Sequence, residues 1–264
     1  MYNGTNLVNN AFSQLTLTLN TTNHLSGKLY DLFVFLNSGT LTIGAGPAWT
    51  SLTARSASIG QVNGIWVNSA AITLTNGSTA YSSIATSEAT YVGTFYATAN
   101  GQTGIALRPA AVSGGANNII GLWNAYNRVV ISAASLDNSA AWTYTTNTVR
   151  PANNSTSNRI SWVDGLGQSA IVSRYGCAIN TASASNGGQV GIGVNSTSAF
   201  ASNSAVGSAS LASNSTAYVA GEVDAYPLLG FNYVQALENC AFYSSGSMLF
   251  NNGSIMQLSL SVQA

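Results

Sequence analysis

Hydrophobic and polar residues alternate with a period of two along much of this 264-residue chain. Residues 14–19 alternate strictly, as does a strand with one solvated face. Residues 28–36 form a more apolar run, which is followed by turn residues at 37–40 and by a second apolar run at 41–43. The pattern therefore predicts a β-hairpin over residues 28–43.

Other short segments are rich in β-branched and aromatic residues, which favour strands. We expect strands at residues 64–68, 71–74, 90–96, 142–146, 159–163, 169–179, 189–194, 216–223, 231–237 and 254–262. The sequence shows neither a sustained helical period nor a heptad repeat. Many short strands separated by turn residues predict an all-β fold, built of antiparallel sandwich or jelly-roll-like units with long polar loops.

Composition divides the chain into two predicted domains. Residues 101–118 contain a proline and several glycines, which indicates a linker or long loop. We place an N-terminal β domain at residues 1–100 and a C-terminal β domain at residues 119–264. Residues 195–215 are rich in Ser and Asn, and we expect them to form a long surface loop or an arm that packs on neighbours.

Charged side chains are scarce. Seven Lys and Arg balance seven Asp and Glu, so that 5% of residues are charged, against about 25% in a typical domain. The basic residues are scattered, so the sequence predicts binding neither to nucleic acid nor to a membrane. We expect no membrane-spanning segment and no secretory signal. A near-neutral surface of amides and hydroxyls favours association with other proteins.

The chain offers little acid–base or metal chemistry. His24 is the single histidine, and no nucleophile elbow accompanies it and Asp31, so we interpret it as a surface or turn residue. Glu222 and Asp224 are the closest carboxylate pair, and we interpret them as a solvated strand end. The alternatives for this pair are a glycosidase site or a calcium ligand set, which normally needs further oxygens.

Two further features have structural interpretations. Cys177 and Cys240 are able to form one disulfide, but we expect two small buried thiols. The glycine-rich residues 187–193 predict a strand with close backbone approach rather than a phosphate loop, because no helix is expected after them. We therefore expect no cofactor and no metal, and we predict that the protein is not an enzyme.

Aromatic residues are the main candidates for contact with a partner. Trp and Tyr fill β cores, dominate protein interfaces and are able to stack on sugar rings, and the sequence leaves these three roles open. The candidate interface or glycan-contact residues are Trp49, Trp66, Trp123, Tyr126 and Trp142.

A series of short motifs extends along nearly the whole chain. They occupy residues 2–5, 12–17, 28–34, 37–40, 46–50, 63–67, 91–94, 122–128, 142–145 and 229–233. The most specific is Leu122-Trp123-Asn124-Ala125-Tyr126-Asn127-Arg128. Taken together, the motifs resemble a family of exterior structural proteins of tailed bacteriophages, of the fibre-like or capsid decoration type.

The resemblance implies a virion protein without a defined catalytic site, made in the host cytoplasm and displayed on the particle exterior. We expect capsid decoration, as a cement protein or short head fibre, because the chain lacks a shaft or heptads. The resemblance further implies a homo-oligomer, with a trimer as the first estimate, in contact with virion proteins such as the major capsid protein. The alternative is a receptor-binding tail fibre or spike component whose exposed aromatics bind a host glycan.

Overall fold

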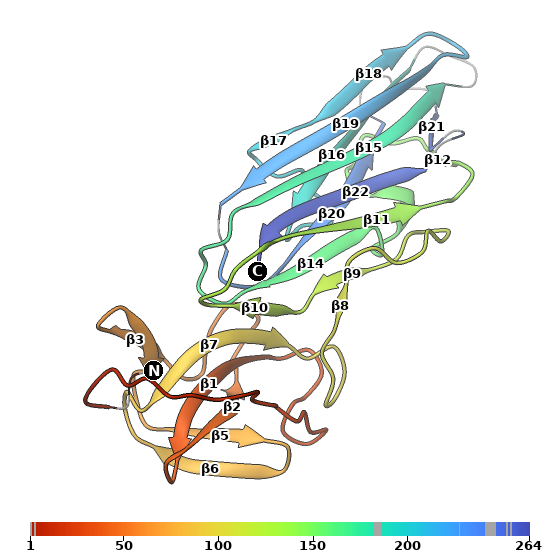
Figure 1. Cartoon of the computed structure of the whole chain (residues 1–264). Coiled ribbons are helices and arrows are strands. Elements are labelled where there is room, and N and C mark those ends of the chain that lie inside the picture. The colour runs from red at the N-terminus through yellow and green to blue at the C-terminus, as the bar shows by residue number, and fades with distance from the viewer. Residues whose placement is uncertain are drawn as a thin grey trace.

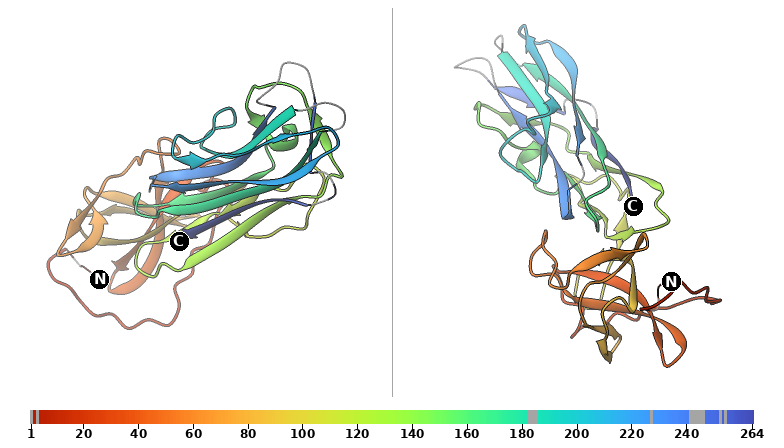
Figure 2. Two further views of the ribbon diagram at one scale, coloured as in Figure 1. Left: turned by 90° about the horizontal axis from the view of Figure 1, so that it is seen from above. Right: turned by 90° about the vertical axis from the view of Figure 1, so that its left-hand side faces the viewer.

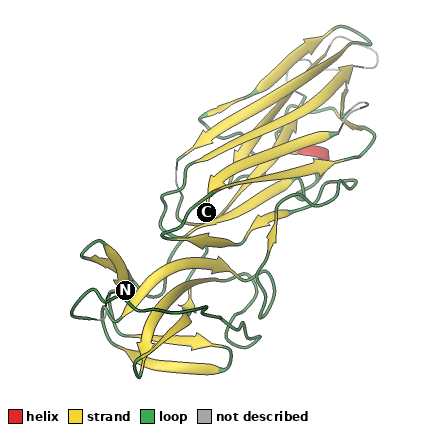
Figure 3. Ribbon diagram, in the orientation of Figure 1, coloured by secondary structure: helices red, strands yellow, loops and turns green. Residues whose placement is uncertain are grey.

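The computed structural model describes residues 2, 4–181, 186–226, 228–240, 247–251, 253 and 255–264. Within them the chain consists of strands and loops with one short 3-10 helix, η1 (Ala152–Asn154), as Figure 3 shows. The all-β prediction is confirmed. Asn3 of the first motif and Ser254 at the start of the last expected strand lie outside the described residues.

The N-terminal lobe is a single curled sheet, drawn from red to yellow in Figure 1. Its strands are β1 (Leu29–Asn37), β2 (Thr40–Ala48), β3 (Ile59–Val62), β4 (Ile65–Asn68), β5 (Ile72–Asn76), β6 (Thr79–Ile84), β7 (Ala89–Tyr96) and β10 (Leu122–Asn124). The order is β3-β4-β7-β1-β2-β5-β6, and β10 pairs with β7. The curl brings Tyr81 of β6 into contact with Phe35 of β1, with ring centroids 5.1 Å apart, although β2 and β5 lie between these strands.

The hairpin expected at residues 28–43 is formed by β1 and β2 and is confirmed. Ser38 and Gly39 at its tip have φ angles of 49° and 84°, which suit the two-residue turns that match strand twist. Alternation along β1 then gives the lobe two different faces. Phe33 and Phe35 are fully buried on the inner face, whereas Val34 is only half-buried on the outer face.

The C-terminal lobe is a sandwich of two sheets (Figure 1). One sheet has the order β11-β22-β15-β19-β17, with β12 and β21 attached, and the other β18-β16-β20-β14-β9-β8, with β13 attached. The bounds are β8 (Ile105–Ala106), β9 (Asn118–Ile120), β11 (Val130–Asp137), β12 (Trp142–Tyr144), β13 (Arg150–Pro151), β14 (Arg159–Asp164), β15 (Ile171–Thr181), β16 (Asn186–Val194), β17 (Ser204–Ala205), β18 (Gly207–Leu211), β19 (Thr216–Ala225), β20 (Gly230–Asn239), β21 (Met248–Phe250) and β22 (Met256–Gln263).

Apolar side chains from both sheets of the sandwich meet in its interior. Tyr175, Ile179 and Leu258 of the first sheet and Ile192 and Val234 of the second are fully buried. Pairing is antiparallel throughout the described strands except between β9 and β14, which run parallel. The glycine-rich residues 187–193 lie in β16, as expected.

The chain crosses between the lobes several times before it completes the sandwich. β8 lies within the predicted linker at residues 101–118 and pairs with β9 of the sandwich, whereas β10 returns to the N-terminal sheet. The right-hand view in Figure 2 shows the two lobes joined end to end. The N-terminal lobe therefore takes one strand from residues 119–264, which the sequence assigned to the second domain.

Two local predictions are wrong. Residues 14–19 belong to no strand, and the Asn76 side chain, rather than a neighbouring strand, bonds to their backbone. Its Oδ1 accepts the Thr18 N–H at 2.9 Å, and its Nδ2 donates to the Thr16 carbonyl at 2.9 Å. Residues 195–215 are not a continuous loop or arm, because β17 and β18 lie within them and pair with β19 and β16.

Candidate functional site

A groove lies on the outer face of the N-terminal sheet, beneath the N-terminal segment that Figure 1 draws in dark red across β1 and β2. Its volume is about 540 Å³, within the range of pockets that hold small ligands. The floor comes from half-buried aliphatic side chains of β1, β2, β4 and β7, namely Val34, Leu41, Ile43, Ile65 and Val92. The opposite wall comes from Val8, Asn9, Asn10, Phe12 and Leu15. We call residues 8–15 the arm.

The groove is uncharged and mostly apolar. None of the residues that line it, all of which are described, carries a charge. Phe12 stands at the rim with 63% of its surface exposed, and Tyr126 with 50%. The Tyr126 hydroxyl accepts the backbone N–H of Trp66 at 3.0 Å. Two of the five candidate aromatics, Trp66 and Tyr126, therefore meet beside the groove.

The chain that follows the arm packs closely, whereas the arm does not. His24 lies in the turn at residues 21–24, one of its two expected positions, but it is fully buried against Tyr30 and Phe95, with ring centroids 5.3 and 5.8 Å away, so the surface alternative is wrong. Burial lowers the pKa of His24, and its Nδ1 accepts the N–H of Asn20 at 2.9 Å. Residues 9–15, described in full, make no hydrogen bond, and the Asn10 amide nitrogen is buried without a partner.

The other three candidate aromatics, Trp49, Trp123 and Trp142, are buried in the core. Trp123 Nε1 donates to Ser169 Oγ at 3.1 Å across the junction of the lobes. Trp142 Nε1 donates to a Glu238 carboxylate oxygen at 2.7 Å. Of the three roles that the sequence left open, the core role applies to these three residues. Their buried rings are not accessible to a partner.

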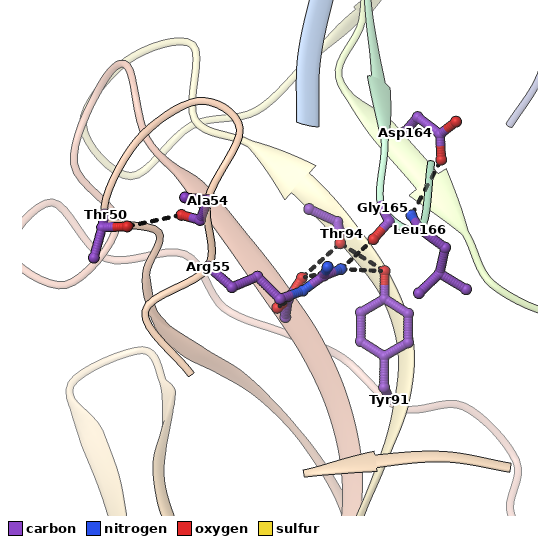
Figure 4. A network of polar contacts seen from close by, with 9 residues as sticks. Thr50, Ala54, Arg55, Tyr91, Thr94, Asp164, Gly165 and Leu166 are labelled. Atoms are coloured by element: carbon purple, nitrogen blue, oxygen red, sulfur yellow. Dashed lines mark hydrogen bonds and ion pairs between the residues drawn. The ribbon is translucent and has the colours of Figure 1, made fainter. Parts of the chain in front are cut away.

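Arg55 is the centre of a polar network that also contains Tyr91, Thr94 and Gly165, shown in Figure 4. The Arg55 guanidinium lies 4.4 Å from the Trp49 ring centroid and 2.7 Å from a carboxylate oxygen of buried Asp31. It also donates to the Gly165 carbonyl in the loop after β14, and so links the two lobes. Thr94 donates to Asp31 at 2.7 Å. Burial raises the pKa of Asp31, against the opposing effects of Arg55 and Thr94.

Three more carboxylates are fully buried, each with donors. Asp164 accepts backbone N–H groups of the turn that follows β14. Burial favours the neutral form of Asp137, but hydrogen bonds from Asn158, Asn153 and Ser139 outweigh it and lower its pKa. Burial raises the pKa of Glu238 to about 7, although Trp142 donates to it and Arg150 lies 2.8 Å away.

Glu222 and Asp224 lie on the outer face of β19, away from the groove. Glu222 pairs with Arg174 at 3.0 Å. In the part of the chain that the structure describes, no three His, Cys, Asp or Glu side chains group as a metal site. Cys177 and Cys240 are buried and are not bonded to each other, as expected.

The same outer face carries the exposed aromatic Tyr218. Its ring lies over Gly176 of β15, where any larger side chain would collide with it. One face of the ring is therefore supported by the sheet, and 65% of the residue is exposed to solvent. Sequence reasoning missed this position because its exposure depends on a glycine 42 residues away on the neighbouring strand.

Comparison of the sequence with protein-family models and with curated proteins gave no match. No helix among the described residues is long and apolar enough to cross a membrane. The geometry of the groove and of the buried charges therefore carries the functional argument.

Proposed function

We propose that this chain is a non-enzymatic structural protein on the exterior of a bacteriophage particle, where it serves as capsid decoration and assembles with copies of itself. The observation that carries the assembly role is the uncharged groove beneath the arm. The cores of protein interfaces are depleted in charge and enriched in aromatic residues. The floor of aliphatic side chains with Phe12 and Tyr126 at the rim has this composition.

The state of the ionisable groups supports a structural role. Four of the seven carboxylates are buried, and each accepts hydrogen bonds from the chain itself. The single histidine is buried with its Nδ1 occupied. A general acid or base must reach a substrate, and the groove presents no titratable carboxylate, histidine or thiol among its described lining residues.

The bacteriophage context comes from the resemblance of the short motifs, of which Leu122–Asn124 forms β10 at the junction of the lobes. On this proposal the partners are further copies of the chain, a trimer being the first estimate, and other virion proteins such as the major capsid protein. Backbone pairing and uncharged side chains would supply the contacts.

Cryo-electron microscopy of intact particles, combined with an antibody against this chain, tests the proposal. We expect two-lobed density of this chain at repeated positions on the head surface. Density confined to the tail would overturn capsid decoration, and purified particles that lack the chain would overturn the virion role altogether.

Tyr218 favours a second candidate, a receptor-binding component that recognises a host glycan. A supported, exposed ring beside the Arg174–Glu222 pair combines a stacking surface with hydrogen-bonding groups. A glycan array tests this candidate with the wild-type chain, Tyr218→Ala and the matched exposed control Tyr226→Ala. Binding that only Tyr218→Ala abolishes would favour receptor binding, and absence of binding by the wild type would remove it.

A further inference from the structure

We propose that the groove receives the arm of a second copy of this chain, with Phe12 as the inserted side chain. The inference rests on the proposed self-assembly and identifies the contact that would produce it. Each copy supplies one Phe12 and one groove, so the contact repeats under two-fold or cyclic symmetry.

The first argument is the mismatch between local pattern and local structure in this segment. Residues 14–19 have the strict alternation of a strand, yet they have no strand partner in their own chain. Residues 9–15 make no hydrogen bond, although backbone N–H and C=O groups are normally paired. A strand from a neighbouring copy would pair these groups, as in other cases of strand addition.

The second argument is the packing of the arm on its own sheet. The arm spans a groove of about 540 Å³ rather than filling it, and the floor residues Val34 and Ile43 remain half-buried. The Asn10 amide nitrogen is also buried without a partner, which is unfavourable. Residues 9–15 therefore lie on the sheet without hydrogen bonds that would fix them there.

The third argument is charge. No Asp, Glu, Lys or Arg occurs before Lys28, so the arm and its flanks are uncharged over their whole length. The groove is uncharged as well. Insertion of the arm into the groove would desolvate no charged group. Desolvation of charge is the main cost of burying a typical protein surface. A basic or acidic partner would find no oppositely charged group in the groove.

The fourth argument is the position of Phe12 itself. The residue is 63% exposed, and the half-exposed Tyr126 lines the same groove. Exposed aromatic residues next to an apolar depression are typical anchors of protein interfaces. In the paired arrangement, Phe12 of one copy would cover the aliphatic floor of the other and contact its Tyr126.

Cross-linking between two differently labelled copies tests the inference. One preparation carries Phe12→Cys, and the other carries Ile43→Cys on the groove floor and a heavy-isotope label. We expect a short bismaleimide reagent to join the mixed chains through residues 12 and 43. The native Cys177 and Cys240 are buried, so wild-type chains serve as the background control. Tyr226→Cys, at an exposed position in the other lobe, replaces Phe12→Cys in the matched control.

The oligomeric state of full-length chains provides the second measurement. We expect wild-type protein to self-associate with concentration in analytical ultracentrifugation, and Phe12→Ser to weaken association by about tenfold or more. Tyr226→Ser should leave it unchanged. Circular dichroism and thermal unfolding of Phe12→Ser show whether the variant is folded, which an exposed position predicts.

The outcomes separate this inference from the proposed function. Cross-links between chains at 12 and 43, with weaker association of Phe12→Ser, support the inference. Association that is unaffected by Phe12→Ser overturns it, and so does binding of an apolar small molecule in the groove of a chain that stays monomeric. If the chain is present on particles, the decoration role stands even when either of these two results overturns the inference. Arm exchange in a chain that is absent from particles overturns decoration alone.

Discussion

The two lobes solve the same problem, the burial of one apolar face per sheet, in different ways. In the C-terminal lobe, each sheet covers the other, and Tyr175, Ile192 and Leu258 are fully buried between them. In the N-terminal lobe, a single sheet curls on itself to bury Phe33 and Phe35. Its outer face has only the N-terminal segment as cover, and Val34 and Ile43 stay half-buried.

The difference shows which apolar sheet faces are covered within the chain and which are partly exposed. A two-sheet sandwich satisfies both apolar faces within one chain. The lone sheet has an outer face that is partly apolar, and residues 9–15, which cover part of it, make no hydrogen bond to it. We therefore expect stability to depend on the sandwich and the junction, and association to depend on the outer face of the N-terminal lobe.

The strongest test of this division is Trp123→Ala at the junction. Trp123 is fully buried, packs against Gly165 and donates to Ser169. Truncation of a buried tryptophan costs roughly 3–5 kcal/mol, and we expect the upper end of that range. Guanidinium unfolding should change from one transition to two as the lobes uncouple. Trp123→Phe, which retains a ring, should lose less unfolding free energy. A loss of less than about 1 kcal/mol for Trp123→Ala would contradict the structural role assigned to the junction.

Arg55→Met probes the same junction through charge. It leaves Asp31 buried without its cation and removes the donor to Gly165. Breaking a buried ion pair in this way should lower the free energy of unfolding by about 3 kcal/mol. The double variant Asp31→Asn/Arg55→Met should recover part of the loss in urea unfolding. Equal losses in the single and double variants would mean that the pair contributes nothing specific.

Glu238 allows a test confined to the sandwich. Its pKa is about 7 in the folded chain, above its ordinary value of 4.5. The folded state therefore binds the Glu238 proton more tightly than the unfolded state does. Protonation of Glu238 stabilises the fold fully below pH 4.5, and this stabilisation is lost as the pH rises through 7. Between pH 5.5 and 7, unfolding free energy should fall by about 2 kcal/mol. Glu238→Gln should remove this slope, and an identical slope in both proteins would contradict the assignment.

Asn76→Ala tests the attachment of the N-terminal segment and has the smallest expected effect. The Asn76 side chain bonds to Thr16, Thr18 and the Ile43 carbonyl. Its loss should lower stability by about 1 kcal/mol and speed hydrogen exchange of the Thr18 amide. The control is Asn117→Ala, at an exposed position, which should change stability by less than about 0.5 kcal/mol. Slow exchange of Thr18 in the Asn76 variant would show that other contacts hold the segment.

The hairpin of β1 and β2 was predictable because its turn residues and its alternation are local signals. Strand β11 was not predictable, because long-range contacts, rather than the local pattern, decide which of its residues are buried. Val130 is 67% exposed, whereas Asp137 on the same strand is fully buried. The carboxylate of Asp137 is stable in the interior because Asn153 and Asn158 donate hydrogen bonds to it. No local sequence pattern reveals those partners.

The candidate site was predictable only in part, for the same reason. Tyr126 was identified by residue type, and it does lie at the rim of the groove. Trp123, only three residues earlier, has a similar sequence context but is fully buried, because β10 pairs with β7 beneath the sandwich. Phe12 was not singled out as a contact residue, since its exposure follows from the failure of residues 14–19 to join a sheet.

The inward placement of charge also affects how quickly copies of this chain meet. Asp31, Asp137, Asp164 and Glu238 are withdrawn from the surface, and Arg55 lies largely inside with Asp31. The remaining surface has little long-range field to orient an approaching copy, so encounter should proceed at the unassisted rate of about 10⁵–10⁶ M⁻¹s⁻¹. That rate should change little with ionic strength. Lifetime and local concentration, rather than electrostatic attraction, would then determine how many copies are joined.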